Sequence, residues 1–204
     1  MKFFLSIHLV CLSIGMLGQY NWTWEELPLM PEAISNNAVA QGVIGEDVYV
    51  YTFSGIDTTK TNEGISLVSM RYSMNEGQWD YIEDLPDTLG KIAAAASSVD
   101  NIIYIIGGYH VFDGAPFELS SDRVHRYCPE TNSYLQDGAS IPFAIDDQVQ
   151  AVWRDSLIYV VTGWSNTQNV EYVQIYNPSI DEWQQGTPVP NGTVYEAFGA
   201  SGTI

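Results

Sequence analysis

After about residue 20, the apolar residues of this chain come in short β-branched runs that are separated by polar turns. This pattern predicts strands rather than helices. In the middle of the chain, Ile92 to Val99 and Ile102 to Ile106 are two such runs joined by a polar turn, and Arg123 to Tyr127 alternates apolar and polar residues. A fourth run begins at Tyr134. The pattern therefore predicts a unit of four short antiparallel strands.

The same unit recurs along the chain at a nearly constant spacing. A strand with a central tyrosine is repeated every 55 residues, at Tyr49, Tyr104 and Tyr159. A later strand in each unit ends in a tyrosine, at Tyr72, Tyr127 and Tyr176. An aromatic residue ahead of an aliphatic-proline step marks the end of each unit, at Trp24, Trp79, Tyr134 and Trp183. A fixed period of this length, built from strands, is typical of the blades of a β-propeller.

The landmarks give the expected domain organisation. We expect repeats over about 22–79, 80–134 and 135–183 and the start of a fourth over 184–204, where Ala197 to Ile204 has the pattern of an opening strand. The predicted fold class is all-β, a propeller of about three four-stranded antiparallel blades plus the first strand of a fourth. Propellers close with about four to eight blades. The sequence therefore predicts either an N-terminal fragment that needs its remaining blades or a chain that pairs with a second copy.

The first eighteen residues have a different composition. A weakly basic Met1-Lys2 precedes an almost wholly apolar stretch from Phe3 to Leu17, and a small Gly18 is followed by polar Gln19. These features are typical of a cleaved secretory signal peptide, so we expect a signal peptide over 1–18, a mature chain over 19–204, and a secreted or periplasmic location. Cleavage would leave Cys128 as the single cysteine, without an intramolecular disulfide partner.

The charge of the chain narrows the classes of partner. The sequence holds 25 Asp and Glu against seven Lys and Arg, for a formal net charge of -18. Such an acidic surface repels phosphate backbones and anionic lipids. We therefore expect no nucleic-acid partner and no membrane insertion after signal cleavage, which leaves a carbohydrate or protein ligand.

Several motifs of this sequence resemble those of the kelch-repeat family, whose members include galactose oxidase relatives. The segment from Ile103 to Gly108 resembles the strand and diglycine signature of that family, and Tyr127 with Trp79 or Trp183 resembles its downstream aromatic marks. The resemblance covers roughly residues 22–204 and implies a propeller. The diglycine is complete only in the second repeat, because the first has Ser54-Gly55 and the third has Thr162-Gly163. In its leader and repeats the chain also loosely resembles exported bacterial sialic acid mutarotases.

The expected strand order places the candidate binding residues on one face. The second-to-third-strand loops and the connections between blades should emerge on the same side, where binding residues concentrate. Aromatic rings beside carboxylates suit sugars. The adjacent carboxylates Asp146 and Asp147 suit either sugar hydroxyls or a cation such as Ca²⁺, or else cap a turn and contact solvent. By register, the residues just before the inner strands are Asn36-Asn37, Lys91, Asp146-Asp147 and Tyr195-Glu196. The ligand-binding candidates are Asn36, Asn37, Lys91, Tyr109, His110, Asp146, Asp147, Gln148, Trp164 and Glu196.

The sequence contains no recognisable catalytic signature, since it lacks a nucleophile elbow, a phosphate-binding glycine loop and a metal-ligand motif. We therefore expect no cofactor and no metal. The favoured function is a secreted binding module for a carbohydrate or protein ligand. One alternative is part of a sugar-modifying enzyme of the mutarotase kind, in which Lys91, Asp146, Asp147 and Glu196 would be the candidate acids and bases. Another is a structural cell-surface segment.

Overall fold

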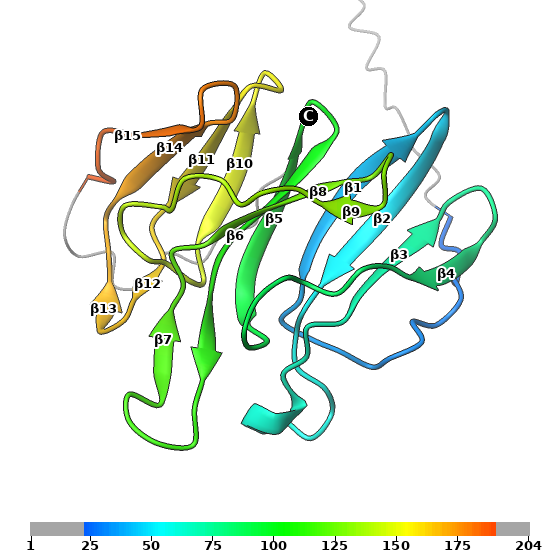
Figure 1. Cartoon of the computed structure of the whole chain (residues 1–204), viewed down its shortest axis with the longest axis horizontal. Coiled ribbons are helices and arrows are strands. Elements are labelled where there is room, and N and C mark those ends of the chain that lie inside the picture. Colours follow the sequence, from blue (N-terminus) through cyan, green and yellow to red (C-terminus); the bar gives the residue numbers. More distant parts are fainter. Residues whose placement is uncertain (1–22, 191–204) are drawn as a thin grey trace, which may run out of the picture.

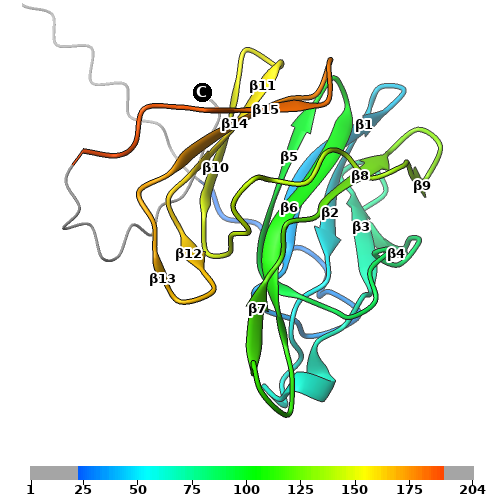
Figure 2. The same cartoon turned by 60° about the vertical axis from the view of Figure 1, so that its left-hand side comes forward.

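The structure, a computed structural model, describes residues 23–190. The predicted signal peptide and the expected opening strand of a fourth unit, with Tyr195 and Glu196, lie outside the described residues. Within the described part, each of the three repeats forms one four-stranded antiparallel sheet, which is called a blade below. The blades stand side by side, with the first strand of each next to the first strand of its neighbour (Figures 1 and 2).

The strands follow one another across each sheet in chain order. Blade 1 holds β1 (Ala38–Ile44), β2 (Asp47–Phe53), β3 (Ser69–Ser73) and β4 (Gln78–Tyr81), and a single 3-10 turn, η1 (Asn62–Gly64), lies between β2 and β3. Blade 2 holds β5 (Ile92–Val99), β6 (Ile102–Val111), β8 (Val124–Cys128) and β9 (Ser133–Tyr134). Blade 3 holds β10 (Val149–Trp153), β11 (Leu157–Val161), β14 (Val173–Asn177) and β15 (Glu182–Gln185).

This arrangement confirms the prediction of an all-β fold made of three four-stranded propeller blades. Residues 23–190 contain no α-helix, and therefore no helix long and apolar enough to span a bilayer.

Two hairpins were not predicted by the apolar pattern. β6 continues past Gly107 and Gly108 to Val111 and pairs with β7 (Glu118–Ser120), where the sequence predicts a loop between the second and third strands. Gly107 and Gly108 have φ values of 69° and 83°, a left-handed conformation that side chains disfavour, so the strand bends there and then resumes. In blade 3, β12 (Trp164–Ser165) pairs with β13 (Gln168–Asn169) at the matching place.

The tyrosine and aromatic landmarks of the repeat are direct cross-strand partners. Tyr72 lies opposite Trp79, Tyr127 opposite Tyr134 and Tyr176 opposite Trp183. Their ring centroids are 5.2, 5.1 and 4.9 Å apart, within the range in which aromatic pairs attract each other. The regular spacing of these residues in the sequence therefore reflects one repeated contact between the third and fourth strands.

The hydrophobic core lies between the blades. One cluster joins Tyr51 and Phe53 of blade 1 to Ile103, Ile105 and Tyr127 of blade 2. A second cluster joins Ile106 and Val124 of blade 2 to Ile158, Val160 and Tyr176 of blade 3. Each of these blades therefore buries its apolar face against the next one.

The position of this core predicts the effect of truncating one of its side chains. Ile105 is fully buried between blades 1 and 2, so Ile105→Ala should lower the free energy of unfolding by about 2–5 kcal/mol. Ile180 is exposed in a turn, so Ile180→Ala should change it by less than about 0.5 kcal/mol. Urea denaturation followed by tryptophan fluorescence measures both, and equal effects would contradict this location of the core.

Candidate functional site

The starts of the inner strands and the loops after the second strands meet at one end of the blades. Ser35 pairs with Ile56, Ile92 with Tyr109, and Asp146 with Trp164, at matching positions of the three blades. This end, at the bottom of Figure 1, is called the loop face below and comprises residues 35–37, 54–66, 87–93, 109–120, 146–148 and 163–169. The loops after the second strands and the connections between blades therefore lie at the same end, as predicted.

A row of backbone hydrogen bonds links the three blades at the loop face. The Ala93 N–H donates to the Asn36 carbonyl at 3.1 Å, and the Asp147 N–H donates to the Ala93 carbonyl at 3.2 Å. All three residues have a left-handed backbone, with φ values of 53°, 56° and 51°. Asn36, Ala93 and Asp147 are therefore the equivalent positions of the repeat.

This equivalence corrects the predicted register of Lys91. The sequence predicts that Lys91 is equivalent to Asn36 and Asp147, whereas in the structure it lies two residues earlier, level with Ile145 of blade 3. The side chain of Lys91 is 1% exposed, so it does not reach the surface of the loop face. A lysine occupies a buried position where the next blade has isoleucine.

Lys91 belongs to a buried group of charged side chains at the junction of blades 1 and 2. Its Nζ lies 3.3 Å from Asp87 Oδ2, an ion pair without the alignment of a hydrogen bond. His125 is 0% exposed and brings Nε2 to 3.1 Å from Asp87 Oδ2 and Nδ1 to 3.1 Å from Asp137 Oδ1. Asp137 is also paired with Arg123 at 2.6 Å.

The environment of this group shifts the pKa values of Lys91 and Asp87. Burial lowers the pKa of Lys91 to about 8, although the Asp87 carboxylate acts in the opposite direction. Burial alone would raise the pKa of Asp87, but the hydrogen bond to His125 and the charge of Lys91 outweigh it and hold that pKa below its ordinary value. Both residues are therefore charged near neutral pH.

His110 connects this group to the β6–β7 hairpin. Its Nδ1 lies 3.1 Å from the Gly90 carbonyl oxygen, and its Nε2 lies 3.9 Å from Asp87 Oδ2. Of the predicted ligand-binding residues, Lys91 and His110 therefore lie together, at the base of the hairpin rather than at its tip.

The predicted carboxylate pair occupies two different environments. Asp147 is exposed, whereas Asp146 is 2% exposed and accepts a 2.6 Å hydrogen bond from the Ser120 hydroxyl. Ser120 in turn exchanges hydrogen bonds with Asn166, so Asp146 helps to join the β6–β7 hairpin to the β12–β13 hairpin. Burial raises the pKa of Asp146 to about 6 despite the Ser120 hydrogen bond, and the negative charge of Asp147 adds to the rise.

The remaining candidates divide between interior and surface. Gln148 is buried, and its amide nitrogen donates to the Ile106 carbonyl at 2.8 Å, whereas its amide oxygen is buried without a partner. The Asn37 amide nitrogen donates to the Thr52 hydroxyl. Tyr109 is half-buried; burial and then the charges of Glu118, Asp147 and Asp146 raise its pKa, which places it close to these acids. Tyr109, Asp146, Asp147 and Trp164 therefore form one group at the junction of blades 2 and 3.

Three exposed apolar side chains of the loop face lie on the hairpins. Phe117 is 60% exposed at the turn before β7, Leu119 follows it on β7, and Trp164 is exposed on β12. Acidic Asp113 and Glu118 lie in the same hairpin and are exposed. The hairpin therefore presents apolar and acidic groups together.

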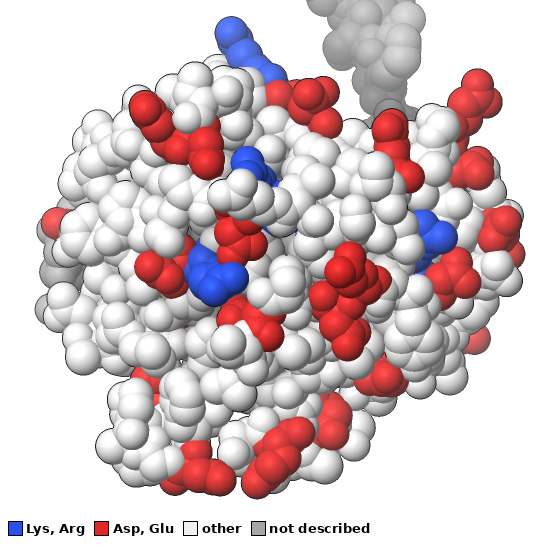
Figure 3. All heavy atoms as spheres, in the orientation of Figure 1, with Lys and Arg blue, Asp and Glu red and all other residues white. Residues whose placement is uncertain are grey.

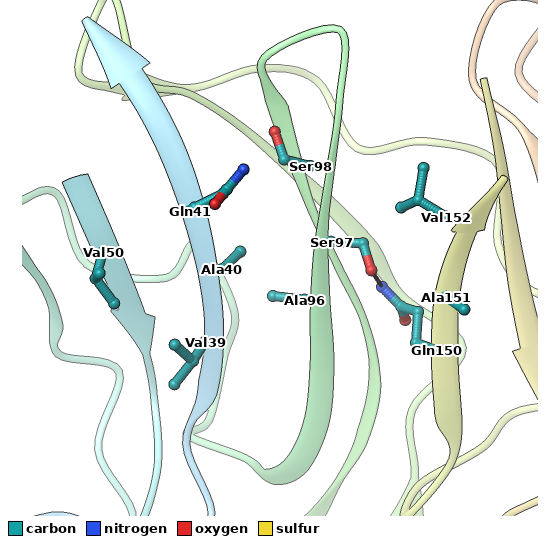
Figure 4. Close-up of a pocket in the computed structure, with 10 residues that line it drawn as sticks. All are labelled: Val39, Ala40, Gln41, Val50, Ala96, Ser97, Ser98, Gln150, Ala151 and Val152. Carbon is teal, nitrogen blue, oxygen red and sulfur yellow. Dashed lines mark hydrogen bonds between the residues drawn. The ribbon is translucent and has the colours of Figure 1, made fainter. Parts of the chain in front are cut away.

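An uncharged hollow of about 460 Å³ lies between the inner strands (Figure 4). Three consecutive residues from each of the inner strands β1, β5 and β10 line this hollow. Their side chains are small, apolar or amide groups, such as those of Ala96, Ser97 and Gln150. The Gln150 amide donates to the Ser97 hydroxyl at 2.9 Å across two blades. In residues 23–190, no group of three or more His, Cys, Asp or Glu side chains is arranged to hold a metal ion.

Sequence reasoning missed the buried partners that organise the loop face. Asp87, Ser120 and His125 are not among the predicted ligand-binding residues. Asp87 and His125 lie 38 positions apart, and strand periodicity carries no information about such a contact. The sequence offers one sign of a buried charged group, because Lys91 is a charged residue directly before a strand of small apolar residues.

The fold and its repeat define a β-propeller, and comparisons with known proteins identify its class. Residues 93–135, within the second blade, match the Kelch motif. Kelch-like protein 25 of Xenopus tropicalis is 25% identical over 86% of this chain and 27% of its own length, and human Kelch-like protein 23 is 36% identical over 46% of this chain and 16% of its own length. The solved structure of YjhT has the same fold, with a TM-score of 0.61 and 15% identity over 80% of this chain and 54% of YjhT.

These matches confirm the predicted resemblance to kelch-repeat proteins, and residues 93–135 of this chain carry the Kelch motif. It spans about a quarter or less of the length of these curated relatives.

The raised pKa of Asp146 predicts a pH dependence of stability. The folded state holds the Asp146 proton up to about pH 6, whereas the unfolded state releases it near pH 3.8, so stability should fall as the pH rises between these values. Asp146→Asn should remove this fall, which amounts to about 3 kcal/mol at most. Urea unfolding at pH 4 and pH 6.5 measures it, with exposed Glu130→Gln as the control. A fall of the same size in Asp146→Asn would contradict the assignment.

Lys91 predicts the opposite trend at alkaline pH. Its pKa is lowered from 10.5 to about 8, so between these values the unfolded state binds more protons than the folded state, and stability should rise with pH. Lys91→Met, which keeps the length but not the charge, should abolish this rise. Thermal unfolding at pH 8 and pH 10 compares the two proteins, with exposed Lys60→Met as the control. The prediction is wrong if Lys60→Met, and not Lys91→Met, removes the rise.

Proposed function

We propose that this kelch propeller is a binding module and that its loop face binds a protein ligand with basic and apolar side chains. The observation that supports the proposal most is the β6–β7 hairpin. It projects from blade 2 and carries exposed Phe117 and Leu119 beside Asp113 and Glu118. Apolar groups exposed together on a rigid scaffold are typical of interaction sites.

The charge of the loop face favours a basic ligand. Acidic side chains gather along the lower edge of Figure 3, over the β6–β7 hairpin and the blade 1 loop that contains η1. Asp147 adds an exposed carboxylate at the start of blade 3. Opposite charge on the ligand would speed association and add specificity, while the exposed aromatic rings would supply most of the affinity.

The hairpin is also well anchored, which favours binding because little conformational freedom is lost. Toward blade 1, His110 is hydrogen-bonded to the Gly90 carbonyl. Toward blade 3, Ser120 is hydrogen-bonded to Asp146 and Asn166. Asn62 of the blade 1 loop donates to Asp113 at 2.9 Å. The hairpin is thus supported from both neighbouring blades.

Substitutions on the loop face test this proposal. A displayed library of random peptides is selected on the protein, and the affinity of enriched peptides is measured by fluorescence polarisation. Phe117→Ser should weaken binding at least about tenfold, because aromatic anchors dominate such interfaces. Asp147→Asn should weaken binding and reduce its dependence on salt; asparagine also tolerates the left-handed backbone at this position.

The control is Trp153→Ser, an exposed aromatic residue at the opposite end of blade 3. It should leave peptide affinity unchanged. Unaltered binding by both loop-face variants, or a loss in Trp153→Ser alone, would contradict the proposal.

A carbohydrate ligand is the second candidate, and the group of Tyr109, Trp164 and Asp147 favours it. Aromatic faces beside a carboxylate match the stacking and hydroxyl hydrogen bonds that sugars require. Binding on a glycan array that is lost in Trp164→Ala, without peptide enrichment, would favour this candidate. Turnover of sugar anomers by the same protein would favour a mutarotase-like activity. The proposed site of action is outside the cell, which the leader-like N-terminal sequence supports.

A further inference from the structure

The two junctions between adjacent blades use different chemistry at equivalent positions. At the junction of blades 2 and 3, the Gln174 side chain accepts from the Phe143 N–H at 2.9 Å and donates to the Phe143 carbonyl at 3.1 Å. At the junction of blades 1 and 2, His125 takes the place of Gln174 and Asp87 takes the place of Phe143. One junction is therefore closed by a neutral amide and the other by a group that can change its charge.

The contacts of His125 depend on its protonation. Each of its ring nitrogens lies 3.1 Å from a carboxylate oxygen, Nε2 from Asp87 and Nδ1 from Asp137. An ionised carboxylate only accepts hydrogen bonds, and a neutral imidazole donates only one. Both contacts are therefore hydrogen bonds only while the ring carries two protons, and loss of one proton leaves a ring lone pair facing a carboxylate.

The His125 ring is 0% exposed and the Asp87 side chain is 4% exposed, so their contact is shielded from water, whereas the Asp137 side chain is 28% exposed. The charged groups around His125 come from three segments: Asp87 and Lys91 from the connection into β5, His110 from β6, and Arg123 with Asp137 from either side of β8 and β9. Lys91 and Arg123 remain paired with Asp87 and Asp137, so neither carboxylate is left without a cation when His125 is neutral. Loss of the proton should thus weaken the junction and not unfold the protein.

The junction also holds segments of the loop face. The Lys91 carbonyl accepts from the Ser54 hydroxyl at 2.6 Å and from the Gly55 N–H at 3.2 Å, and His110 lies on the neighbouring Gly90 carbonyl. The connection 87–91 therefore joins the blade 1 loop to the base of the β6–β7 hairpin. A change at Asp87 is transmitted to both through these bonds.

We propose that His125, bridging Asp87 and Asp137, is a pH-sensitive latch that locks blade 1 to blade 2 when the imidazole is protonated and loosens the base of the β6–β7 hairpin when it is not. The latch is a property of the junction, and it is independent of which ligand the loop face binds.

The first test is the pH dependence of stability. Histidine changes charge between about pH 5 and 8. Loss of the second imidazole proton removes one of the two hydrogen bonds of the ring in the folded protein and none in the unfolded chain, so the free energy of unfolding should be lower above this range than below it. His125→Gln introduces the residue found at the equivalent place in blade 3, and its unfolding free energy should decrease less over the same range.

Two further variants separate the latch from general damage to the junction. Asp137→Asn removes one acceptor and should also reduce the pH dependence. The triple variant Asp87→Phe, Lys91→Ile, His125→Gln copies the neutral junction of blades 2 and 3. It should fold, and its free energy of unfolding should lack the pH dependence that the latch contributes. Parallel pH curves for the wild-type protein and these variants would overturn the proposal.

Two measurements on the wild-type protein need no variant. Nitrogen NMR of ¹⁵N-histidine should show both His125 ring nitrogens protonated at pH 5.5, and a single protonated nitrogen at this pH would overturn the proposal. Hydrogen exchange, corrected for its intrinsic pH dependence, should be faster at pH 8 than at pH 5.5 in residues 87–91 and 107–111 and unchanged in blade 3 at 157–161. Equal protection of residues 87–91 and 107–111 at the two pH values would also overturn it.

Discussion

Packing of one blade on the next is the interaction on which the rest of this structure depends. A single four-stranded sheet has two faces and cannot bury its apolar residues alone, so Tyr51 and Phe53 of blade 1 are buried only because Ile103 and Ile105 of blade 2 cover them. Within each blade, the pair between the third and fourth strands, such as Tyr127 with Tyr134, holds the outer strand to the sheet. The sequence repeats because every blade needs the same two contacts, one with the next blade and one between its own third and fourth strands.

The same packing explains why the blades are joined at the loop face by an ordered backbone. Asn36, Ala93 and Asp147 all adopt a left-handed conformation, which is unfavourable for residues other than glycine, asparagine and aspartate. Ala93 bears this cost without help from a side chain. The hydrogen bonds from Ala93 to Asn36 and from Asp147 to Ala93 offset it, and they set the distance between successive inner strands. The hairpins that carry Phe117 and Trp164 are thereby held at fixed positions.

Most of the fold could be predicted from the sequence because it depends on features that repeat. The strand patterns around Tyr49, Tyr104 and Tyr159 gave the sheets and their order. The register of Lys91 could not be predicted, since the connections between blades differ in length and periodicity does not carry through them. The β6 extension was also missed, because two glycines are typical of a strand end, whereas here their left-handed backbone lets the strand continue.

The prediction of the candidate site was less complete, for a physical reason. A carboxylate in the sequence can face solvent or be buried, and only tertiary contacts decide between the two. Asp146 and Asp147 are neighbours in the chain, yet Asp146 is turned inward to Ser120 while Asp147 is exposed. The sequence contains the residues of the loop face, but it does not show which of them are exposed and which are buried.

The positions that depart from the repeat are therefore the informative ones. A propeller can be built from neutral junctions, as Ile145 and Gln174 demonstrate between blades 2 and 3. Burying Lys91, Asp87 and His125 at the equivalent junction costs desolvation energy that a hydrophobic contact would avoid, and ion pairs in the interior seldom recover all of it. Stability alone does not account for this choice of residues. A charged junction directly under the most exposed hairpin of the loop face couples the protonation of that junction to the surface above it, which a neutral junction cannot do.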